Sequence, residues 1–323
     1  MPKFHVLLTD YAWPYLDIER STLADVDAEL HVAPSTDAAT LAKAASACHA
    51  VMTTWAPITA DVIEAAPNLR IVARLGIGLD NIAVDVATER GVLVTNVPGY
   101  CVQEVAEHAL ALILALARRV GTFHHATKQG IYDLKSGFPL HRLADQTLGI
   151  VGFGGSGREL ARRALGIGLR VVATSRTRRA LPEGVEWRSL DELLSESDFV
   201  SLHAPLSAET RHLVDAKALA RMKRSAYLIN TARGGLVDHR ALVAALASGD
   251  LAGAALDVQE PEPPDLALPP WNDPRVIVTP HAAFASEESL AELRHRASHA
   301  VAACLTGKRP ADVVNPKAFA RRG

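Results

Sequence analysis

Short runs of apolar residues alternate along this chain with longer stretches in which apolar and polar residues mix at helical spacing. Strand-length apolar runs separated by amphipathic, helix-length stretches are typical of βαβ units, which build a parallel sheet with helices on both faces. We therefore predict an α/β protein made of doubly wound parallel sheets.

The first part of the chain predicts five strands with helices between them. The strands are expected at 4–8, 29–32, 50–53, 69–75 and 92–95, and helices begin near Asp17, Asp37 and Thr59. Pro98 and Gly99 then interrupt the pattern, and a long helix is expected over 102–120. Because Pro and Gly mark turns, we expect a domain boundary near Pro98.

The second part repeats the same rhythm. Six strands are expected at 148–151, 170–174, 199–202, 226–229, 253–256 and 276–278, with a helix over 158–165 after the first of them. A Pro-rich loop follows over 261–274, and a last helix over 286–306 has no strand after it. We expect that helix to pack back on the first domain, so the predicted domains are 1–98 with 286–323, and 99–285.

Composition and charge exclude several classes of protein. The chain has 323 residues, enough for two domains of about 150 residues each, with 49% hydrophobic residues and a formal net charge of −2. Such a balance lacks the basic character of a general nucleic-acid or anionic-membrane binder, so we expect neither partner. The longest apolar run, 109–117, is far shorter than a membrane-spanning helix.

The three cysteines, Cys48, Cys101 and Cys304, are far apart in the sequence and have no paired spacing. This predicts neither a disulfide framework nor a zinc site and favours a reducing, cytoplasmic compartment. His295 and His299 stand four residues apart without a third ligand nearby in the sequence, so we expect no metal.

A glycine-rich turn follows the first strand of the second part. Its sequence is Gly152-Phe153-Gly154-Gly155-Ser156-Gly157, a G-x-G-x-x-G pattern between a strand and a helix. The first glycine permits a tight turn, the second lets a pyrophosphate approach the backbone, and the third lets helix and strand pack closely. We interpret this turn as the phosphate-binding site of a Rossmann-like, dinucleotide-binding domain.

The end of the next strand indicates which dinucleotide binds. An acidic residue would bind the ribose 2′-hydroxyl of NAD there, but the chain has Ser175, Arg176 and Thr177, followed by Arg178 and Arg179. Guanidinium groups without a carboxylate suit a 2′-phosphate, because Arg donates paired hydrogen bonds to phosphate. We therefore predict NADP as the preferred cofactor, with NAD as the alternative, and Arg176 as the main contact.

Polar side chains that suit catalysis follow the later strands. Arg233 follows one strand, Asp257 ends another with Glu262 beyond it, and His281 follows the last. Ligands bind at the carboxyl ends of the strands in open α/β sheets. We expect a guanidinium, a carboxylate and an imidazole to meet there around a bound cofactor.

These motifs together resemble the D-isomer-specific 2-hydroxy acid dehydrogenase family, which includes phosphoglycerate dehydrogenase, glyoxylate/hydroxypyruvate reductase and the C-terminal binding protein. The resemblance covers nearly the whole chain. It rests on the glycine turn and on the segments 74–82, 95–99, 230–238, 255–258 with Glu262-Pro263, and 279–281. It implies an NAD(P)-dependent reductase of small 2-oxo acids, with residues 1–98 and 286–323 as a substrate-binding lid domain, residues 99–285 as the dinucleotide-binding domain, and the active site in the cleft between them.

The resemblance also implies a role for each motif residue. His281 would act as general acid and base, Glu262 would orient it, and Arg233 would bind the substrate carboxylate and polarise the carbonyl. Further substrate contacts would come from Gly76, Ile77, Gly78, Asn96 and Phe284. Further cofactor contacts would come from His203, Ala204, Pro205, Thr231, Ala232 and Asp257. A homodimer is expected, with the 102–120 helix region at its interface.

Two other functions remain open from the sequence. The segment His281-Ala282-Ala283-Phe284 is closer to the C-terminal binding protein branch, so an NAD(H)-sensing regulatory protein is the main alternative. Formate or phosphite oxidation is a weaker one, since formate enzymes of this superfamily pair the histidine with Gln where this chain has Glu262. The intact set of Arg233, Glu262 and His281 favours catalysis.

Overall fold

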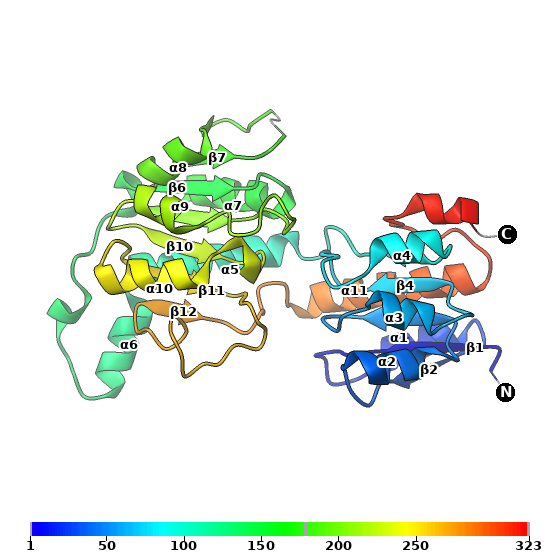
Figure 1. The fold of residues 1–323 in the computed structure, drawn as a ribbon. Coiled ribbons are helices and arrows are strands. Elements are labelled where there is room, and N and C mark those ends of the chain that lie inside the picture. Colours follow the sequence, from blue (N-terminus) through cyan, green and yellow to red (C-terminus); the bar gives the residue numbers. More distant parts are fainter. Residues whose placement is uncertain (1, 178–179, 322–323) are drawn as a thin grey trace. The chain divides into compact units, whose positions relative to one another are not determined.

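The computed structural model describes residues 2–177 and 180–321. Arg178 and Arg179 of the predicted basic segment lie outside the described residues. The chain divides into two compact units: unit 1 comprises Met1–Tyr100 with Ser286–Gly323, and unit 2 comprises Cys101–Ala285 (Figure 1). Among the helices in the described part of the chain, none combines the length and apolar character that crossing a bilayer requires.

Unit 1 is built on a five-stranded parallel sheet in the order β2-β1-β3-β4-β5. Its strands are β1 (Phe4–Leu8), β2 (Ala28–Val32), β3 (Ala50–Thr53), β4 (Ile71–Arg74) and β5 (Leu93–Thr95). Its helices are α1 (Asp17–Ala24), α2 (Ala38–Ala45), α3 (Ala60–Glu64), α4 (Val84–Glu89), α11 (Glu287–Leu305) and the 3-10 helix η4 (Pro316–Arg321).

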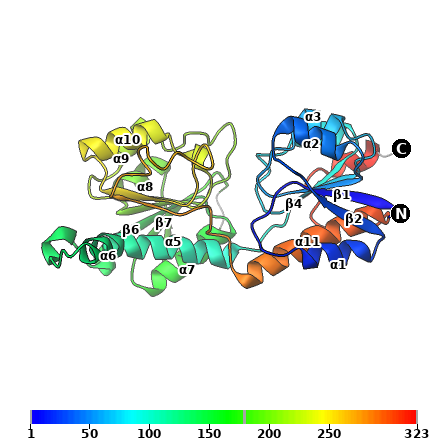
Figure 2. The ribbon, with the colours of Figure 1, turned by 90° about the horizontal axis from the view of Figure 1, so that it is seen from below.

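Helices cover both faces of the unit 1 sheet. Helices α2 and α3 lie on one face and α1 and α11 on the other (Figure 2). Leu7, Val51 and Val72 of the sheet are buried in one cluster with Leu41 of α2 and Ile63 of α3. The predicted packing of the last helix on the first domain is observed: α11 contacts α1, β3 and β4.

Unit 2 is built on a seven-stranded parallel sheet in the order β12-β11-β10-β9-β6-β7-β8. Its strands are β6 (Thr147–Val151), β7 (Arg170–Thr174), β8 (Val185–Trp187), β9 (Phe199–Leu202), β10 (Tyr227–Asn230), β11 (Gly253–Leu256) and β12 (Val276–Val278). Its helices are α5 (Val102–Ala117), α6 (Val120–Lys128), α7 (Gly155–Gly166), α8 (Leu190–Glu196), α9 (Ala216–Arg221) and α10 (His239–Ser248), with the 3-10 helices η1 (Leu134–Gly137), η2 (Leu143–Asp145) and η3 (Gly234–Leu236).

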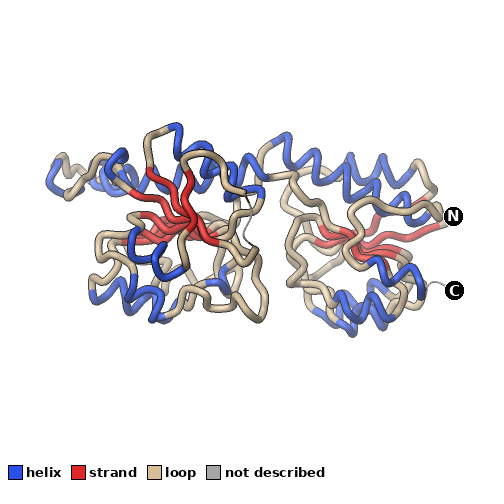
Figure 3. Tube along the Cα trace, turned by 90° about the horizontal axis from the view of Figure 1, so that it is seen from above, coloured by secondary structure: helices blue, strands red, loops and turns tan. Residues whose placement is uncertain are grey.

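Two buried clusters flank the unit 2 sheet, whose strands run between two helical layers in Figure 3. One cluster joins the sheet to α8, α9 and α10 through side chains such as Leu193, Leu219 and Leu242. The other joins it to α5 and α7 through Ile113 and Leu160. The predicted α/β class with two parallel sheets is therefore confirmed.

The structure differs from the predicted elements in unit 2. The helix expected over 102–120 ends at Ala117, and α6 begins separately at Val120, because Arg119 between them has a left-handed backbone with φ of 52°. The sheet of unit 2 also has a seventh strand, β8, that the pattern did not predict. A three-residue strand at the edge of a sheet is too short to produce a recognisable apolar run.

Candidate active site

Most of the predicted site residues follow the carboxyl ends of neighbouring strands in unit 2. Gly152 follows β6, His203 follows β9, Thr231 follows β10 and Asp257 follows β11, while His281 lies three residues beyond β12. These strands are parallel and adjacent, so their carboxyl ends share one edge of the sheet. The edge is where open α/β sheets bind ligands.

His281 and Glu262 are in direct contact. Glu262 Oε2 lies 2.9 Å from His281 Nδ1, and Glu262 Oε1 accepts a hydrogen bond of 2.7 Å from the backbone N–H of Gln259. Both carboxylate oxygens are thus engaged, which fixes the carboxylate against the imidazole. Phe284 packs edge-on against the His281 ring with ring centroids 6.0 Å apart. The sequence interpretation had paired these two residues, and the structure brings them together.

The buried carboxylate of Asp257 anchors the segment that carries His281. Asp257 is fully buried and accepts hydrogen bonds from the backbone N–H groups of Ala282 and Ala283 and from the hydroxyl of Thr279, at 2.9, 3.0 and 2.5 Å. The backbone N–H of His281 donates to the Asp257 carbonyl at 2.7 Å. These bonds hold His281 at φ 52°, a left-handed conformation uncommon for residues other than glycine.

The segment around Arg233 packs against the segment that carries Glu262. A Cβ atom on Gly234 would lie 2.2 Å from the carbonyl carbon of Gln259, so only glycine permits this approach. Asn230 donates from its side-chain amide to the Arg233 carbonyl at 2.8 Å and accepts from the N–H of Ala232 at 3.1 Å. Asn230 therefore shapes the turn that presents the half-buried Arg233.

The glycine turn has the geometry that a dinucleotide requires. A Cβ on Gly152 would lie 2.5 Å from the His203 backbone, and one on Gly157 would lie 2.4 Å from the Gly152 carbonyl oxygen. A Cβ on Gly154 would meet nothing within 4 Å, which leaves the backbone accessible at the start of α7. Close packing at the outer glycines and open space at the middle one suit a pyrophosphate at the helix N-terminus.

Helix α7 begins earlier than the sequence predicted, at Gly155 instead of residue 158. A Cβ on Gly155 would lie 2.9 Å from Val102 of α5. The side chain of Phe153 is buried and stacks edge-on with Trp187, so any cofactor contact from Phe153 comes from its backbone.

His203 links the glycine turn to β9. Its Nδ1 lies 3.1 Å from the Ser156 hydroxyl and its Nε2 lies 2.9 Å from the Ser201 hydroxyl. Burial lowers the pKa of His203 to about 4, because a charged imidazole would lose its hydration there.

Along the same edge, the buried hydroxyl of Thr231 has no hydrogen-bond partner among the described residues, as expected of a group that meets a ligand. The loop after β9 that begins with His203 also contains Ala204 and Pro205, and the loop after β10 that begins with Thr231 also contains Ala232.

Arg176 and Thr177 at the ribose end are exposed, and Ser175 is half-buried. Ser175 follows β7 and donates from its hydroxyl to the Thr177 carbonyl at 2.7 Å. Arg176 forms an ion pair of 3.1 Å with Glu209, and its side chain is 86% exposed. An ion pair that exposed contributes little stability, so the guanidinium can move to a ligand at small cost.

The predicted substrate residues of unit 1 form a turn after β4. Gly76 has φ of 155°, and its carbonyl accepts from the Val97 N–H at 2.9 Å. The Asn96 amide donates to the Ile77 carbonyl at 2.8 Å, and Arg74 donates to the Gly78 carbonyl at 3.0 Å. Asn96 therefore holds the turn that contains Gly76, Ile77 and Gly78.

Three positioning residues were not predicted. His108 of α5 places Nε2 3.1 Å from the Thr279 hydroxyl and 3.5 Å from Asp257 Oδ1. The Gln259 side chain donates to the carbonyls of Leu256 and Thr279 and so joins the ends of β11 and β12. For Thr279, the Thr279-Pro280-His281 motif was the sequence feature that could have indicated a role. The roles of His108 and Gln259 depend on contacts that the sequence does not reveal.

A seven-stranded parallel sheet with this glycine turn and a His–Glu pair at its carboxyl edge defines a nicotinamide-dependent oxidoreductase. A family model described as D-isomer specific 2-hydroxyacid dehydrogenase, NAD binding domain, matches residues 110–283. A glyoxylate reductase of Korarchaeum cryptofilum is 45% identical over 268 residues, which are 80% of each chain. A hydroxypyruvate reductase of Thermotoga maritima is 42% identical over 234 residues, which are 72% of this chain and 76% of the relative.

Solved structures agree with these matches. The crystal structure of D-lactate dehydrogenase from Aquifex aeolicus, complexed with NAD and lactic acid, superposes with a TM-score of 0.86 at 29% identity and covers 96% of this chain and 99% of that one. The chain therefore belongs to the D-isomer specific 2-hydroxyacid dehydrogenase family. The enzymatic interpretation holds over the regulatory, NAD(H)-sensing alternative.

Proposed function

We propose that this protein reduces a small 2-oxo acid to the D-2-hydroxy acid, with glyoxylate and hydroxypyruvate as the first candidates. The substrate class is taken from the similar reductases, whose names give those acids. The observation that supports the proposal most is the 2.9 Å contact between Glu262 and His281 at the carboxyl edge of the unit 2 sheet.

A bound nicotinamide supplies the hydride in this reaction. His281 donates a proton to the carbonyl oxygen as the hydride arrives, and it removes that proton in the reverse direction. Because Glu262 holds Nδ1, the proton moves at Nε2. Glu262 orients the ring through this contact. Arg233 binds the substrate carboxylate and polarises the carbonyl, as a planar guanidinium does well.

We propose two roles for Asp257: it lies near the nicotinamide, and it acts as a positioning residue. Its buried carboxylate orders the backbone of residues 281–283, so it fixes where the imidazole stands. His108 and Thr279 extend that support from α5 and β12. A general acid needs such support, because a displacement of about 1 Å costs about 100-fold in rate.

NADP is the cofactor that we propose, with NAD as the alternative. Ser175 stands at the end of β7, where NAD-binding domains place a carboxylate, and exposed Arg176 is next to it. Gly76, Ile77, Gly78, Asn96 and Phe284 are proposed as substrate contacts. We also propose a cytoplasmic enzyme, since its three cysteines are buried thiols of the kind that a reducing compartment preserves.

The proposal is tested by steady-state kinetics with a panel of 2-oxo acids and both reduced cofactors. We expect turnover of glyoxylate or hydroxypyruvate, a fall in kcat of about 100-fold or more in His281→Gln, and a smaller fall in Glu262→Gln with little change in KM. The exposed His299→Gln serves as the control and should match the wild type. Wild-type kcat in His281→Gln, or no turnover with any acid despite cofactor binding, would contradict the proposal.

A further inference from the structure

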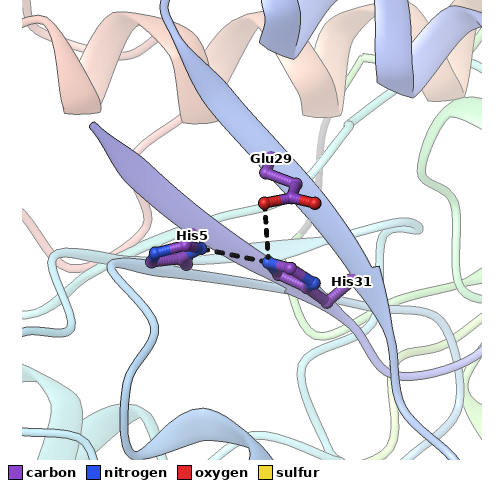
Figure 4. A group of neighbouring side chains, drawn as sticks. All are labelled: His5, Glu29 and His31. Atoms are coloured by element: carbon purple, nitrogen blue, oxygen red, sulfur yellow. Dashed lines mark hydrogen bonds and ion pairs between the residues drawn. The ribbon is translucent and has the colours of Figure 1, made fainter. Parts of the chain in front are cut away.

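Three side chains that could hold a metal ion converge on the unit 1 sheet. His5 lies on β1, and Glu29 and His31 lie on β2; Figure 4 shows the three side chains turned toward one another. His5 pairs with Glu29 in the parallel register, and Leu7 pairs with His31. Since side chains alternate between the faces of a strand, His5, Glu29 and His31 share one face of the sheet.

The distances between these side chains suit a transition-metal ion. His5 Nδ1 lies 3.0 Å from His31 Nε2, and His31 Nε2 lies 3.7 Å from Glu29 Oε2. Two ligand atoms at 2.0–2.1 Å from a tetrahedral zinc ion are about 3.3 Å apart. An ion can therefore replace the proton that the two imidazoles share with only small movements, and the carboxylate supplies the negative charge that a dication requires.

The neighbours of His5 hold its ring in place. On one side its ring centroid lies 5.2 Å from that of His31, and on the other it stacks on His49 at 6.2 Å. His49 Nδ1 accepts from the His5 backbone N–H at 3.1 Å, so His49 supports His5 without presenting that nitrogen as a ligand. The ligands stand on adjacent hydrogen-bonded strands, so the backbone fixes their spacing before any ion binds.

We propose that His5, Glu29 and His31 form an accessory site for a divalent transition-metal ion, with Zn²⁺ as the representative ion. Two histidines and one carboxylate are a common zinc ligand set, and the exposure of the His31 and Glu29 side chains, 43% and 52%, leaves water to complete the coordination. The sequence had predicted no metal, because the ligands come from two strands and match no spacing motif.

The expected effect of the ion is to join an edge strand to its sheet. Within the described residues, β2 is the outermost strand on its side of the sheet and pairs with β1 alone. His5 is the second residue of β1, so the site lies near the amino ends of the strands, whereas the Gly76 turn follows the carboxyl end of β4. The ion therefore stabilises unit 1 and takes no part in hydride transfer.

The test is zinc titration of the tag-free, chelator-treated full chain by calorimetry, with Co²⁺ absorption as a second readout of coordination. We expect one Zn²⁺ per chain and a rise in Tm with added zinc. Loss of even an outer-shell partner lowers metal affinity about 10–100-fold, so His31→Asn and Glu29→Gln should each weaken binding by at least about tenfold. Both side chains are exposed, and circular dichroism in chelator checks that the variants fold.

His299→Asn is the matched control, because His299 is another exposed histidine of unit 1 and is bonded through Nδ1 to the His295 carbonyl. It should bind zinc like the wild type. Wild-type affinity in His31→Asn, or no zinc binding by the wild type, overturns the proposal. So does a binding event that persists in His31→Asn and disappears in His281→Gln, since the ion would then belong to unit 2.

Discussion

At the residue scale, a few buried or bonded polar groups determine what this site can do. The Asp257 carboxylate accepts three hydrogen bonds and holds the segment in which His281 has a left-handed backbone, which is uncommon for residues other than glycine. The motifs predicted that Asp257, Glu262 and His281 gather at one edge of the sheet. The Glu262–His281 contact agrees with that expectation, and the chemical roles stay predictions for kinetics to test.

The cofactor preference can be reversed by changing two neighbouring residues. In Ser175→Asp with Arg176→Ser, a carboxylate would bind the ribose 2′-hydroxyl and repel a 2′-phosphate, so we expect kcat/KM to shift from NADPH toward NADH by about tenfold or more. The ratio of kcat/KM values for the two cofactors measures the shift. An unchanged ratio would show that other residues bind the adenosine ribose of the cofactor.

The lowered pKa of the half-buried His203 makes the stability of the fold depend on pH. Its pKa is about 4 in the folded chain against 6.5 in the unfolded chain, so below pH 6.5 the unfolded state binds more protons. Stability should fall as the pH drops from about 6.5 to 4 and level off below, by up to about 3 kcal/mol from this group.

His203→Gln, which cannot titrate, should lose less stability over that range than the wild type. The measurement is urea unfolding of the cofactor-free protein at pH 6.5 and pH 4.5. His299→Gln, at an exposed position, is the control and should keep the wild-type difference. Equal losses in the wild type and in His203→Gln would exclude a contribution from the imidazole.

At the element scale, the junction of β6 and α7 combines close backbone packing with an open stretch of backbone. Gly152 and Gly157 are needed because the backbone packs too closely for a Cβ, whereas Gly154 faces open space. The close packing at Gly152 and Gly157 agrees with what the strand–turn–helix context predicts, and the phosphate-binding role of the turn stays a prediction. The start of α7 at Gly155 could not be predicted, because glycine has low helix propensity and the turn geometry overrides it.

The structural and the cofactor-binding effects of these glycines should be distinguishable when each glycine is changed to alanine. In Gly154→Ala we expect a free energy of unfolding within about 0.5 kcal/mol of the wild type and a higher Kd for NADPH, because the methyl group blocks the approach to the backbone. In Gly157→Ala the Cβ would lie 2.4 Å from the Gly152 carbonyl oxygen, so we expect a loss of about 1–3 kcal/mol. Unfolding and cofactor titration test both, and unchanged cofactor binding in Gly154→Ala would be inconsistent with a phosphate site here.

At the scale of the whole molecule, one surface segment exposes more apolar side chains than a monomer would be expected to leave in water. Exposed apolar side chains are frequent from the start of α6 to Phe138, just after η1: Val120, Ile131, Tyr132, Leu134 and Phe138. Soluble monomers rarely leave large apolar patches in water. We therefore propose that this segment, next to the 102–120 region predicted from the sequence, is where a homodimer forms.

Tyr132→Arg combined with Leu134→Glu should weaken that dimer. Tyr132 is 96% exposed and Leu134 is 63% exposed, so the changes should leave the fold of one chain intact. Sedimentation equilibrium measures the oligomeric state, and we expect a shift from dimer to monomer. Tyr15→Arg in unit 1, where Tyr15 is 74% exposed, is the control. Dimers that persist in the double variant would place the interface elsewhere.

Apolar periodicity and short motifs indicated the fold class, the positions of most strands along the chain, the glycine turn and the family, because they are local signals that tertiary contacts seldom override. The end of α5, the seventh strand β8 and the support that His108 and Gln259 give to the His281 segment became evident only from the folded chain. The same is true of the cluster of His5, Glu29 and His31. Such features depend on which distant residues meet when strands pair and helices pack, and one-dimensional patterns do not record those contacts.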